Sequence, residues 1–253
     1  MGTFLAPRLW SVYERVTHAA GAALGRPARL VQGESFSQLT RGELDAAFVC
    51  GLPYVALREQ FGSAVEALAA PVMAGERYGD RPVYFSDVLV RADAPAARLQ
   101  DLAGGRLGVN EPESHSGYGV VLAALADRGV PEGGFAEVVA TGSHARSLEG
   151  LRAGRIDVAA VDSHLLAALG ADDPRLGEHL RVVEPLGPSP AQPLTAGPAL
   201  SEQERVLVRE ALREVERTDL APGVSFARWE PVDDADYDPI RRMRAAGAAR
   251  AGF

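Results

Sequence analysis

The sequence Leu107-Gly-Val-Asn-Glu-Pro-Glu-Ser-His-Ser-Gly-Tyr118, followed directly by Gly-Val-Val-Leu-Ala-Ala-Leu125, decides how this chain is interpreted. Residues 107–109 have the apolar composition of a buried strand, and the apolar residues of 116–127 recur at the spacing of one helix face. Ser114 or Ser116 is the expected N-cap, because a serine oxygen accepts hydrogen bonds from the first free amides of a helix. We therefore expect a strand, a loop rich in hydroxyl groups and a helix start.

Two interpretations of this helix start are open. The first is an anion-binding site, because backbone N–H groups and the positive end of the helix dipole face the loop. Gly117 lets a ligand approach the backbone closely, and Ser114, His115 and Ser116 add hydrogen-bond donors. The second is an ordinary capped helix without a ligand, since capping serines are common.

The composition excludes several classes of function. A chain of 253 residues, 47% of them hydrophobic, can bury a sizeable core and form two lobes. Its formal net charge of -8 argues against nucleic acid or an anionic membrane as the main partner. All 26 basic residues are arginines, which excludes Schiff-base chemistry on lysine, and the single cysteine, Cys50, excludes an internal disulfide and a cysteine-rich metal site. We expect neither a bound metal nor a cofactor.

The sequence leaves the location of the protein open. Residues 1–7 lack the basic region and continuous apolar core of a secretory signal, and no window offers the roughly 18 apolar residues of a membrane span. We therefore expect no membrane insertion by this chain. The protein is cytoplasmic if the sequence is complete, or periplasmic or otherwise extracytoplasmic if a leader has been removed.

Strand and helix patterns alternate along most of the chain. Strands are expected at residues 29–32, 43–51, 71–73, 83–91, 107–109, 136–140 and 155–162. Helices are expected at residues 5–24, 36–41, 55–61, 116–127, 146–153, 164–169, 201–218 and 240–249. We expect a loop at 52–54 and a proline-rich connection at 185–198.

A repeated pattern supports two similar halves. Leu39-x-x-Gly42 leads into Glu-Leu-Asp-Ala-Ala-Phe-Val, and Leu151-x-x-Gly154 leads into Arg-Ile-Asp-Val-Ala-Ala-Val. Such alternation predicts parallel α/β lobes whose ligand sites lie beyond the carboxyl ends of the strands. The candidate positions are after Val109, after Ala140 and at Asp162, and they are expected to share one sheet edge.

With these motifs in view, residues 31–215 resemble the phosphate-, phosphonate- and phosphite-binding subunits of ABC importers. Four anchors carry the resemblance: Tyr84-Phe-Ser86 leading to Val88-Leu-Val-Arg91, Ser114-His-Ser-Gly-Tyr118, Gly142-Ser-His144, and Gly154-Arg-Ile-Asp157 running to Val161-Asp-Ser163. The resemblance implies a type 2 periplasmic binding protein fold with two lobes. Each lobe is a mixed, mainly parallel sheet flanked by helices, with the ligand cleft between the lobes. We expect residues 1–91 and 184–253 to form one lobe and 92–183 the other.

The resemblance also implies roles for individual residues. The serine-rich helix start and a histidine hold the phosphorus oxyanion, a carboxylate accepts a hydrogen bond from a protonated oxygen or an amine of the ligand, and a tyrosine closes the other side. The residues that match these roles are Ser114, His115, Ser116, Gly117, His144, Asp162 and Tyr84. Phe36 matches an aromatic of the first lobe, without the hydroxyl, and Tyr54 lies near the family's Gly-Pro loop. His115 stands where the family has a small hydroxyl residue.

Structural roles are alternatives for three of these residues. His144 follows a Gly-Ser turn and could be a capping or surface residue. Asp162 could cap the helix that starts at Ser163, and Tyr84 could be a core residue of its strand.

The function that this pattern favours is a non-enzymatic receptor for a small phosphorus oxyanion: phosphate, phosphite, or an alkyl- or aminoalkylphosphonate. Its expected partner is an ABC permease. The alternatives are a cytoplasmic enzyme on the same fold, of the menaquinone- or thiamine-precursor type, and a ligand-sensing module. No nucleophile elbow or cofactor loop is present to support the enzyme.

Overall fold

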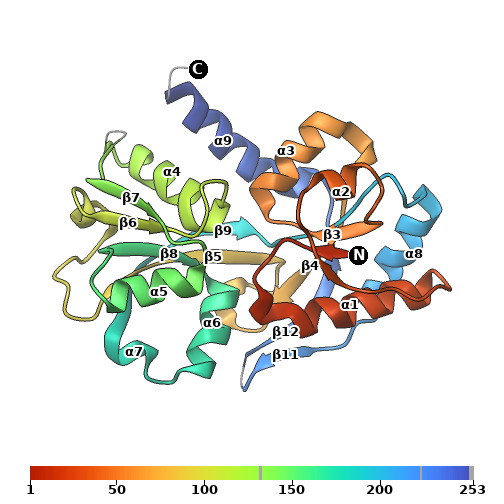
Figure 1. Cartoon of the computed structure of the whole chain (residues 1–253), viewed down its shortest axis with the longest axis horizontal. Helices are drawn as coiled ribbons and strands as arrows, with labels where there is room; N and C mark the ends of the chain where they lie inside the picture. The colour runs from red at the N-terminus through yellow and green to blue at the C-terminus, as the bar shows by residue number, and fades with distance from the viewer. Residues whose placement is uncertain (131–132, 223, 251–253) are drawn as a thin grey trace. The chain divides into compact units, whose positions relative to one another are not determined.

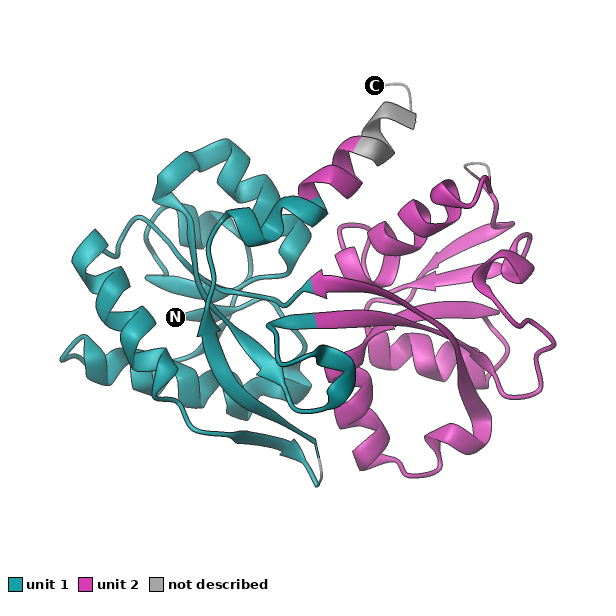
Figure 2. Ribbon diagram, turned by 180° about the vertical axis from the view of Figure 1, so that it is seen from behind, with its two compact units in different colours: residues 1–83, 190–240 teal, residues 84–189, 241–253 magenta. Residues whose placement is uncertain are grey.

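The computed structural model of the chain describes residues 1–130, 133–222 and 224–250, without the side chains of 246–250 (Figure 1). The chain divides into two compact units (Figure 2). Unit 1 contains Met1–Val83 and Pro190–Ile240, and unit 2 contains Tyr84–Ser189 and the segment that begins at Arg241. Each unit has one mixed β-sheet accompanied by helices, so the predicted α/β fold class is confirmed.

Unit 1 is built on a seven-stranded sheet with the order β11-β12-β4-β10-β3-β1-β2. Its strands are β1 (Gly2–Thr3), β2 (Val31–Gln32), β3 (Ala46–Phe48), β4 (Glu66–Met73), β10 (Leu194–Ala196), β11 (Thr218–Ala221) and β12 (Val224–Pro231). Its α-helices are α1 (Trp10–Ala23), α2 (Ser37–Thr40), α3 (Gly51–Phe61), α8 (Glu202–Arg213) and the start of α9 (Asp238–Arg250). Short 3-10 turns are η1 (Pro7–Leu9), η2 (Gly62–Ala64), η3 (Glu76–Tyr78) and η6 (Ala235–Tyr237).

The expectation of a mainly parallel sheet is wrong for unit 1. β1 pairs in parallel with β2 and β3, whereas β3–β10, β10–β4, β4–β12 and β12–β11 are antiparallel. The antiparallel pairs all involve β10 or β12, which come from the second passage of the chain through unit 1.

Unit 2 is built on a five-stranded sheet with the order β7-β6-β8-β5-β9. Its strands are β5 (Val83–Arg91), β6 (Arg106–Val109), β7 (Glu137–Ala140), β8 (Val158–Asp162) and β9 (Leu180–Pro190). Its helices are η4 (Leu99–Leu102), η5 (His115–Gly119), α4 (Val120–Asp127), α5 (His144–Arg152), α6 (Ser163–Asp172) and α7 (Leu176–His179). β6 pairs in parallel with β7 and with β8, and β5 runs antiparallel to β8 with Ser86 opposite Asp162.

Three strands of unit 2 each lead into a helix at the same sheet edge. β6 precedes η5 and α4, β7 precedes α5, and β8 precedes α6. Because these strands are parallel neighbours, their carboxyl ends and the helix starts that follow lie at one edge. The expectation of three adjacent strand-to-helix turns is therefore confirmed.

The borders of the units differ from the expected lobes. The chain passes from unit 1 to unit 2 between Val83 and Tyr84, and back between Ser189 and Pro190, instead of near residues 91 and 184. The reason is that β5 and β9 are neighbouring strands of the five-stranded sheet, so both belong to unit 2. The segment from Arg241 belongs to unit 2, because Met243 packs against an apolar cluster of that unit.

Two local expectations are wrong. Residues 52–54 are the first turn of α3 instead of a loop, because a proline such as Pro53 is tolerated in the first turn of a helix. The proline-rich connection at 185–198 contains the second half of β9 and all of β10. β9 accepts prolines because it lies at the edge of its sheet.

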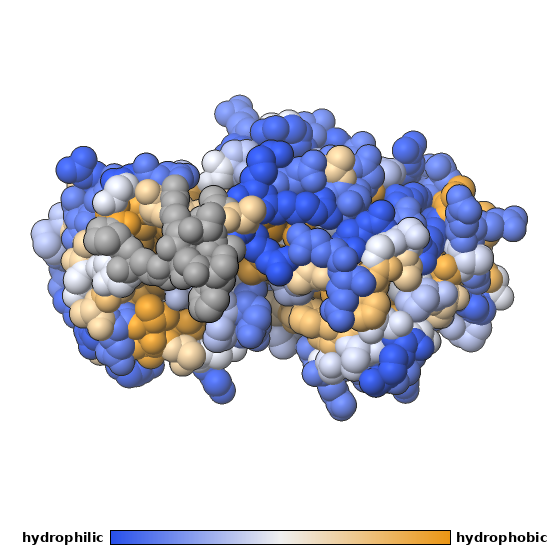
Figure 3. Space-filling view, turned by 90° about the horizontal axis from the view of Figure 1, so that it is seen from above, coloured by the Kyte–Doolittle hydropathy of each residue, from blue (hydrophilic) through white to orange (hydrophobic). Residues whose placement is uncertain are grey.

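One face of the molecule and the exposed hydrophobic side chains describe the surface. The face drawn in Figure 3 is mainly hydrophilic, and its hydrophobic side chains form small separate groups. Large hydrophobic side chains are exposed at Phe61, Leu122, Val138, Val182, Val206 and Leu207. None of the helices described is both long and apolar enough to span a membrane.

Candidate anion-binding site

Ser114 starts the helix that follows β6. Its hydroxyl oxygen accepts a hydrogen bond from the amide of Gly117 at 3.1 Å, and its carbonyl accepts one from the amide of Gly119 at 3.0 Å. The first turn, η5, is π-helical, and α4 continues from it. Ser114 is therefore the N-cap, which leaves the hydroxyl of Ser116 available for another partner.

That partner is His144. The hydroxyl oxygen of Ser116 lies 3.1 Å from Nε2 of His144 and 3.5 Å from the hydroxyl oxygen of Ser114. His144 is the first residue of α5, whose N-cap, Ser143, accepts a hydrogen bond from the amide of Arg146 at 3.2 Å. The two helix starts after β6 and β7 are thus joined by one side-chain contact.

His144 is neutral at physiological pH. Burial lowers its pKa to about 4, although the charge of Asp162 and the carbonyl of Ala160 act in the opposite direction. Burial dominates because a charged imidazolium loses its hydration there. A neutral imidazole can still donate one hydrogen bond to an anion.

Asp162 caps α6. One of its carboxylate oxygens accepts hydrogen bonds from the amides of His164 at 2.8 Å and Leu165 at 3.2 Å. The structural alternative for Asp162 is therefore confirmed. The charge of Asp162 also raises the pKa of His144, the first residue of α5.

His115 points toward the outer strands of the sheet. Its Nε2 lies 3.1 Å from the hydroxyl oxygen of Ser189 at the end of β9, and its ring meets the ring of Tyr84 edge-on at 6.4 Å between centroids. Tyr84 also contacts the ring of His164, with the centroids 6.1 Å apart. Burial lowers the pKa of His115 to about 4, so this ring is neutral as well.

The two aromatic candidates of unit 1, Phe36 and Tyr54, both contact other side chains of that unit. Phe36 packs against Phe4, with the ring centroids 4.5 Å apart. Tyr54 is fully buried in the core of unit 1, and its hydroxyl donates to Asp234 at 2.9 Å. Burial and this carboxylate raise the pKa of Tyr54 well above its ordinary value. Ligand contacts by Phe36 and Tyr54 stay predictions.

Sequence reasoning missed two polar residues near this site. Ser189 lies 74 residues from its partner His115, and nothing in the local sequence links them. Asn110 follows β6 directly, and its side-chain oxygen lies where a β-carbon on Gly117 would be, 1.9 Å from that position. The available signal for Asn110 was its place after a parallel strand.

We call the assembled set the polar cluster: Tyr84, Asn110, Ser114, His115, Ser116, Gly117, His144, Asp162 and Ser189. It contains no arginine, and both of its histidines, His115 and His144, are neutral because burial lowers their pKa. Any attraction for an anion must therefore come from hydroxyl groups, imidazole N–H groups and helix starts. Such a set suits a small tetrahedral oxyanion better than an extended polyanion.

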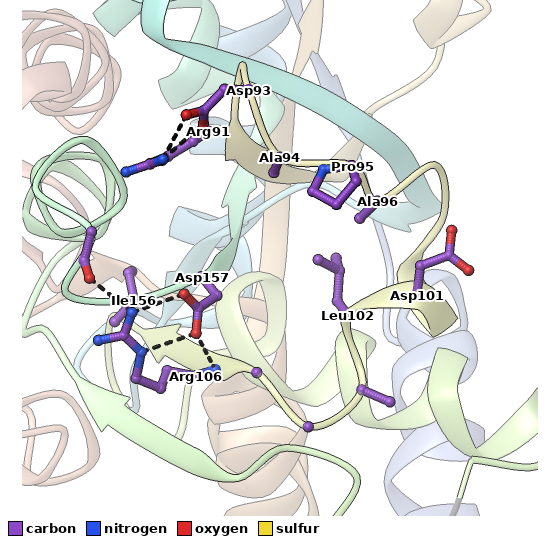
Figure 4. Close-up of a pocket in the computed structure, with 14 residues that line it drawn as sticks. Arg91, Asp93, Ala94, Pro95, Ala96, Asp101, Leu102, Arg106, Ile156 and Asp157 are labelled. Carbon is purple, nitrogen blue, oxygen red and sulfur yellow. Dashed lines mark hydrogen bonds and ion pairs between the residues drawn. The ribbon is translucent and has the colours of Figure 1, made fainter.

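A separate cavity of about 780 Å³ lies at another part of unit 2 (Figure 4). Arg106 binds the carboxylate of Asp157 through two nitrogens at 2.9 and 2.8 Å, and Arg91 binds Asp93 in the same way at 2.9 and 2.6 Å. The charges in this cavity are thus compensated within the protein. The polar cluster remains the better candidate for an anion.

The two α/β units with mixed sheets have the fold of type 2 periplasmic binding proteins. The family follows from the sequence, because the profile described as "ABC transporter, phosphonate, periplasmic substrate-binding protein" matches residues 11–237. The chain therefore belongs to the family of periplasmic substrate-binding proteins of phosphonate ABC transporters. It is a family of transport proteins, and this assignment does not favour the enzyme alternative. No curated protein matches the sequence.

Solved structures agree on the fold. A binding protein component of an ABC phosphonate transporter from Pseudomonas aeruginosa, PA3383, is 19% identical, with a TM-score of 0.76 over 99% of this chain and 86% of that one. PhnD1 from Prochlorococcus marinus, solved with methylphosphonate, is 14% identical, with a TM-score of 0.77 over 96% and 95%. XAC2383 from Xanthomonas citri, solved with chloride, is 19% identical, with a TM-score of 0.70 over 99% and 97%.

Proposed function

We propose that the polar cluster of unit 2 binds the phosphorus-bound oxygens of a phosphonate or a related small phosphorus oxyanion. The observation that carries this proposal is the 3.1 Å contact between Ser116 and His144, which brings two helix starts to one point. Helix starts with hydroxyl groups favour anions, and family membership supports a phosphonate as the anion.

Some residues of the polar cluster are proposed to donate hydrogen bonds to the ligand, and the others are proposed to shape the site around it. Ser114, Ser116 and His144 are the proposed donors to the oxyanion, because the cap of Ser114 uses a lone pair of its oxygen and leaves the O–H group for donation. Ser116 and His144 share one hydrogen in their mutual contact, so this neutral pair keeps one further hydrogen for the ligand. Gly117 leaves room for the side chains of Asn110 and His144 beside the first helical turn, and the ring of His115 in that turn meets the ring of Tyr84. Asp162 holds α6 through its cap, and its carboxylate is proposed to face the amine of an aminoalkylphosphonate.

The proposal extends to the place of the protein in transport. We infer that the chain works outside the cytoplasm and delivers its ligand to an ABC permease, without catalysing a reaction. Membership in a periplasmic substrate-binding family supports both inferences.

A ligand panel tests the function. Methylphosphonate, 2-aminoethylphosphonate, phosphite, phosphate and sulfate are added separately, and the free energy of unfolding and the heat of binding are measured. A true ligand at about a hundredfold excess over its Kd stabilises the protein by about 2.7 kcal/mol. Absence of saturable binding for every phosphorus compound would contradict the proposal.

Variants test the assignment of residues. Ser116→Ala and His144→Ala each remove a donor to a charged group, so each should weaken binding by about tenfold or more. The matched control is His179→Ala, because His179 is exposed at the end of α7 and lies outside the polar cluster. If His144→Ala binds as tightly as the unchanged protein, the assignment is wrong.

A further inference from the structure

Asn110 is the single asparagine of the whole sequence, and it lies at a position where a ligand could contact its side chain. It follows β6, the strand that lies between β7 and β8 in the sheet of unit 2. The carboxyl end of such a parallel strand is where α/β proteins place their ligands.

The carboxamide of Asn110 lies against the first turn of the helix that follows. A β-carbon added to Gly117 would come within 1.9 Å of Oδ1 of Asn110 and 3.2 Å of Cε1 of His144. The amide and the imidazole that contacts Ser116 therefore meet at the same glycine. Only a glycine leaves room for the amide there.

Oδ1 of Asn110 is buried and forms no hydrogen bond with any of the described residues. A buried amide oxygen without a partner is costly, so most such atoms in native proteins have a partner in the protein, in water or in a ligand. The hydroxyl groups of Ser114 and Ser116 do not donate to this oxygen, and their recorded contacts are with Gly117, with His144 and with each other.

We propose that Asn110 is a specificity-determining residue whose Oδ1 accepts a hydrogen bond from a protonated oxygen of the phosphorus oxyanion. This inference rests on the proposed function of the polar cluster. Asp162 is less suited to the same role, since one of its oxygens already accepts two backbone hydrogen bonds. An acceptor at this point favours a monoprotonated oxyanion over a fully ionised tetrahedral anion such as sulfate.

The test uses calorimetric titration of the full chain and of Asn110→Ala with methylphosphonate and with sulfate. Asn110→Ala should weaken methylphosphonate binding by about tenfold and leave sulfate binding no weaker, so the preference for methylphosphonate falls. Without ligand, the melting temperature of the variant should be unchanged or higher, because the substitution removes an unpaired buried group. A merely structural role of Asn110 would lower that melting temperature and leave the preference intact.

Asn110→Asp makes the test sharper, because a carboxylate has the same shape and only accepts hydrogen bonds. At pH 6, where methylphosphonate is largely a monoanion, this variant should bind more tightly than Asn110→Ala. At pH 8.5 the ligand is a dianion, and this advantage should disappear through like-charge repulsion. Loss of binding by Asn110→Asp at both pH values would show that the amide donates instead, and would overturn the inference.

Ser225→Ala is the matched control, since Ser225 in unit 1 also carries a buried hydroxyl that bonds to no described residue. It should change neither affinity nor preference. If the unchanged protein binds none of the phosphorus compounds, the proposed function and this inference both fail. If it binds them and Asn110→Ala behaves like it, only this inference fails.

Discussion

Residues 39–51 of unit 1 and 151–163 of unit 2 follow the same local pattern, but the turns in which they end have different surroundings. In each segment a helix ends at a glycine with positive φ, 77° at Gly42 and 65° at Gly154. A buried strand follows, β3 or β8, and then a new helix, α3 or α6. The repeated sequence therefore builds the same succession of elements twice.

The difference lies in the residue before each new helix. Cys50 makes no side-chain cap at α3, and a β-carbon on the neighbouring Gly51 would lie 2.4 Å from the side chain of Ile240. Asp162 caps α6 with two hydrogen bonds and acts on the pKa of His144. The turn in unit 1 thus joins an apolar core, and the turn in unit 2 joins a polar cluster.

The largest expected effect that separates the units is acid sensitivity. Burial holds the pKa of His115 and His144 at about 4, below the ordinary 6.5. Both rings are neutral in the folded protein, so the free energy of unfolding has its full value above pH 6.5. It decreases as the pH falls toward 4, because the histidines of the unfolded chain take up protons first. At pH 5 the loss is about 2 kcal/mol per histidine.

Hydrogen exchange at pH 7 and pH 5, read by mass spectrometry on peptides from each unit, checks this prediction. Peptides of unit 2 should lose protection first, while fluorescence of Trp10 and Trp229 reports on unit 1. His144→Asn should reduce the acid sensitivity of unit 2, and His18→Gln, on the exposed side of α1, should not. Equal acid sensitivity of the two units would remove this contrast.

The next effect tests the similarity of the two segments. Gly42→Ala and Gly154→Ala each force an L-residue into the left-handed region, so each should lower the free energy of unfolding by about 1–2 kcal/mol. Steric crowding adds little, because the nearest atoms to an added β-carbon are 3.5 and 3.6 Å away.

Urea denaturation measures both losses. The control is Gly177→Ala in α7, where an added β-carbon meets no atom within 4 Å and φ is not positive. That variant should be neutral or slightly stabilising. If either glycine variant in the repeated pattern were neutral as well, the two segments would not share the same backbone requirement.

The smallest effect tests the difference between the turns. Asp162→Ala removes the cap of α6 and should lower the free energy of unfolding by about 1 kcal/mol, while Asp162→Asn, which keeps an accepting oxygen, should lose less. Cys50→Ala should cost less than Asp162→Ala, because Cys50 does not cap α3. Thermal denaturation of the three variants compares them, and an equal loss for Cys50→Ala and Asp162→Ala would contradict the contrast.

Local signals predicted most elements of unit 2 correctly. β5 has the predicted bounds, and β6 and β7 differ from their predicted bounds by one residue. These features depend on residues a few positions apart, so a single sequence contains them. β10 and β12 were missed because β10 pairs with β3 and β12 pairs with β4, which are distant in the chain. Edge pairing lets β9 continue through its prolines.

Some features of the polar cluster follow from the local sequence, and others follow from the tertiary structure. The sequence alone determined where its helices start, because the caps at Ser114, Ser143 and Asp162 are hydrogen bonds to amides two or three residues away. Only the tertiary structure decided that Ser116 meets His144, that His115 meets Ser189 and that Asn110 lies on Gly117. The physical reason is that parallel pairing of β6 with β7 and β8 sets which strand ends become neighbours, and that pairing depends on the packing of the whole unit.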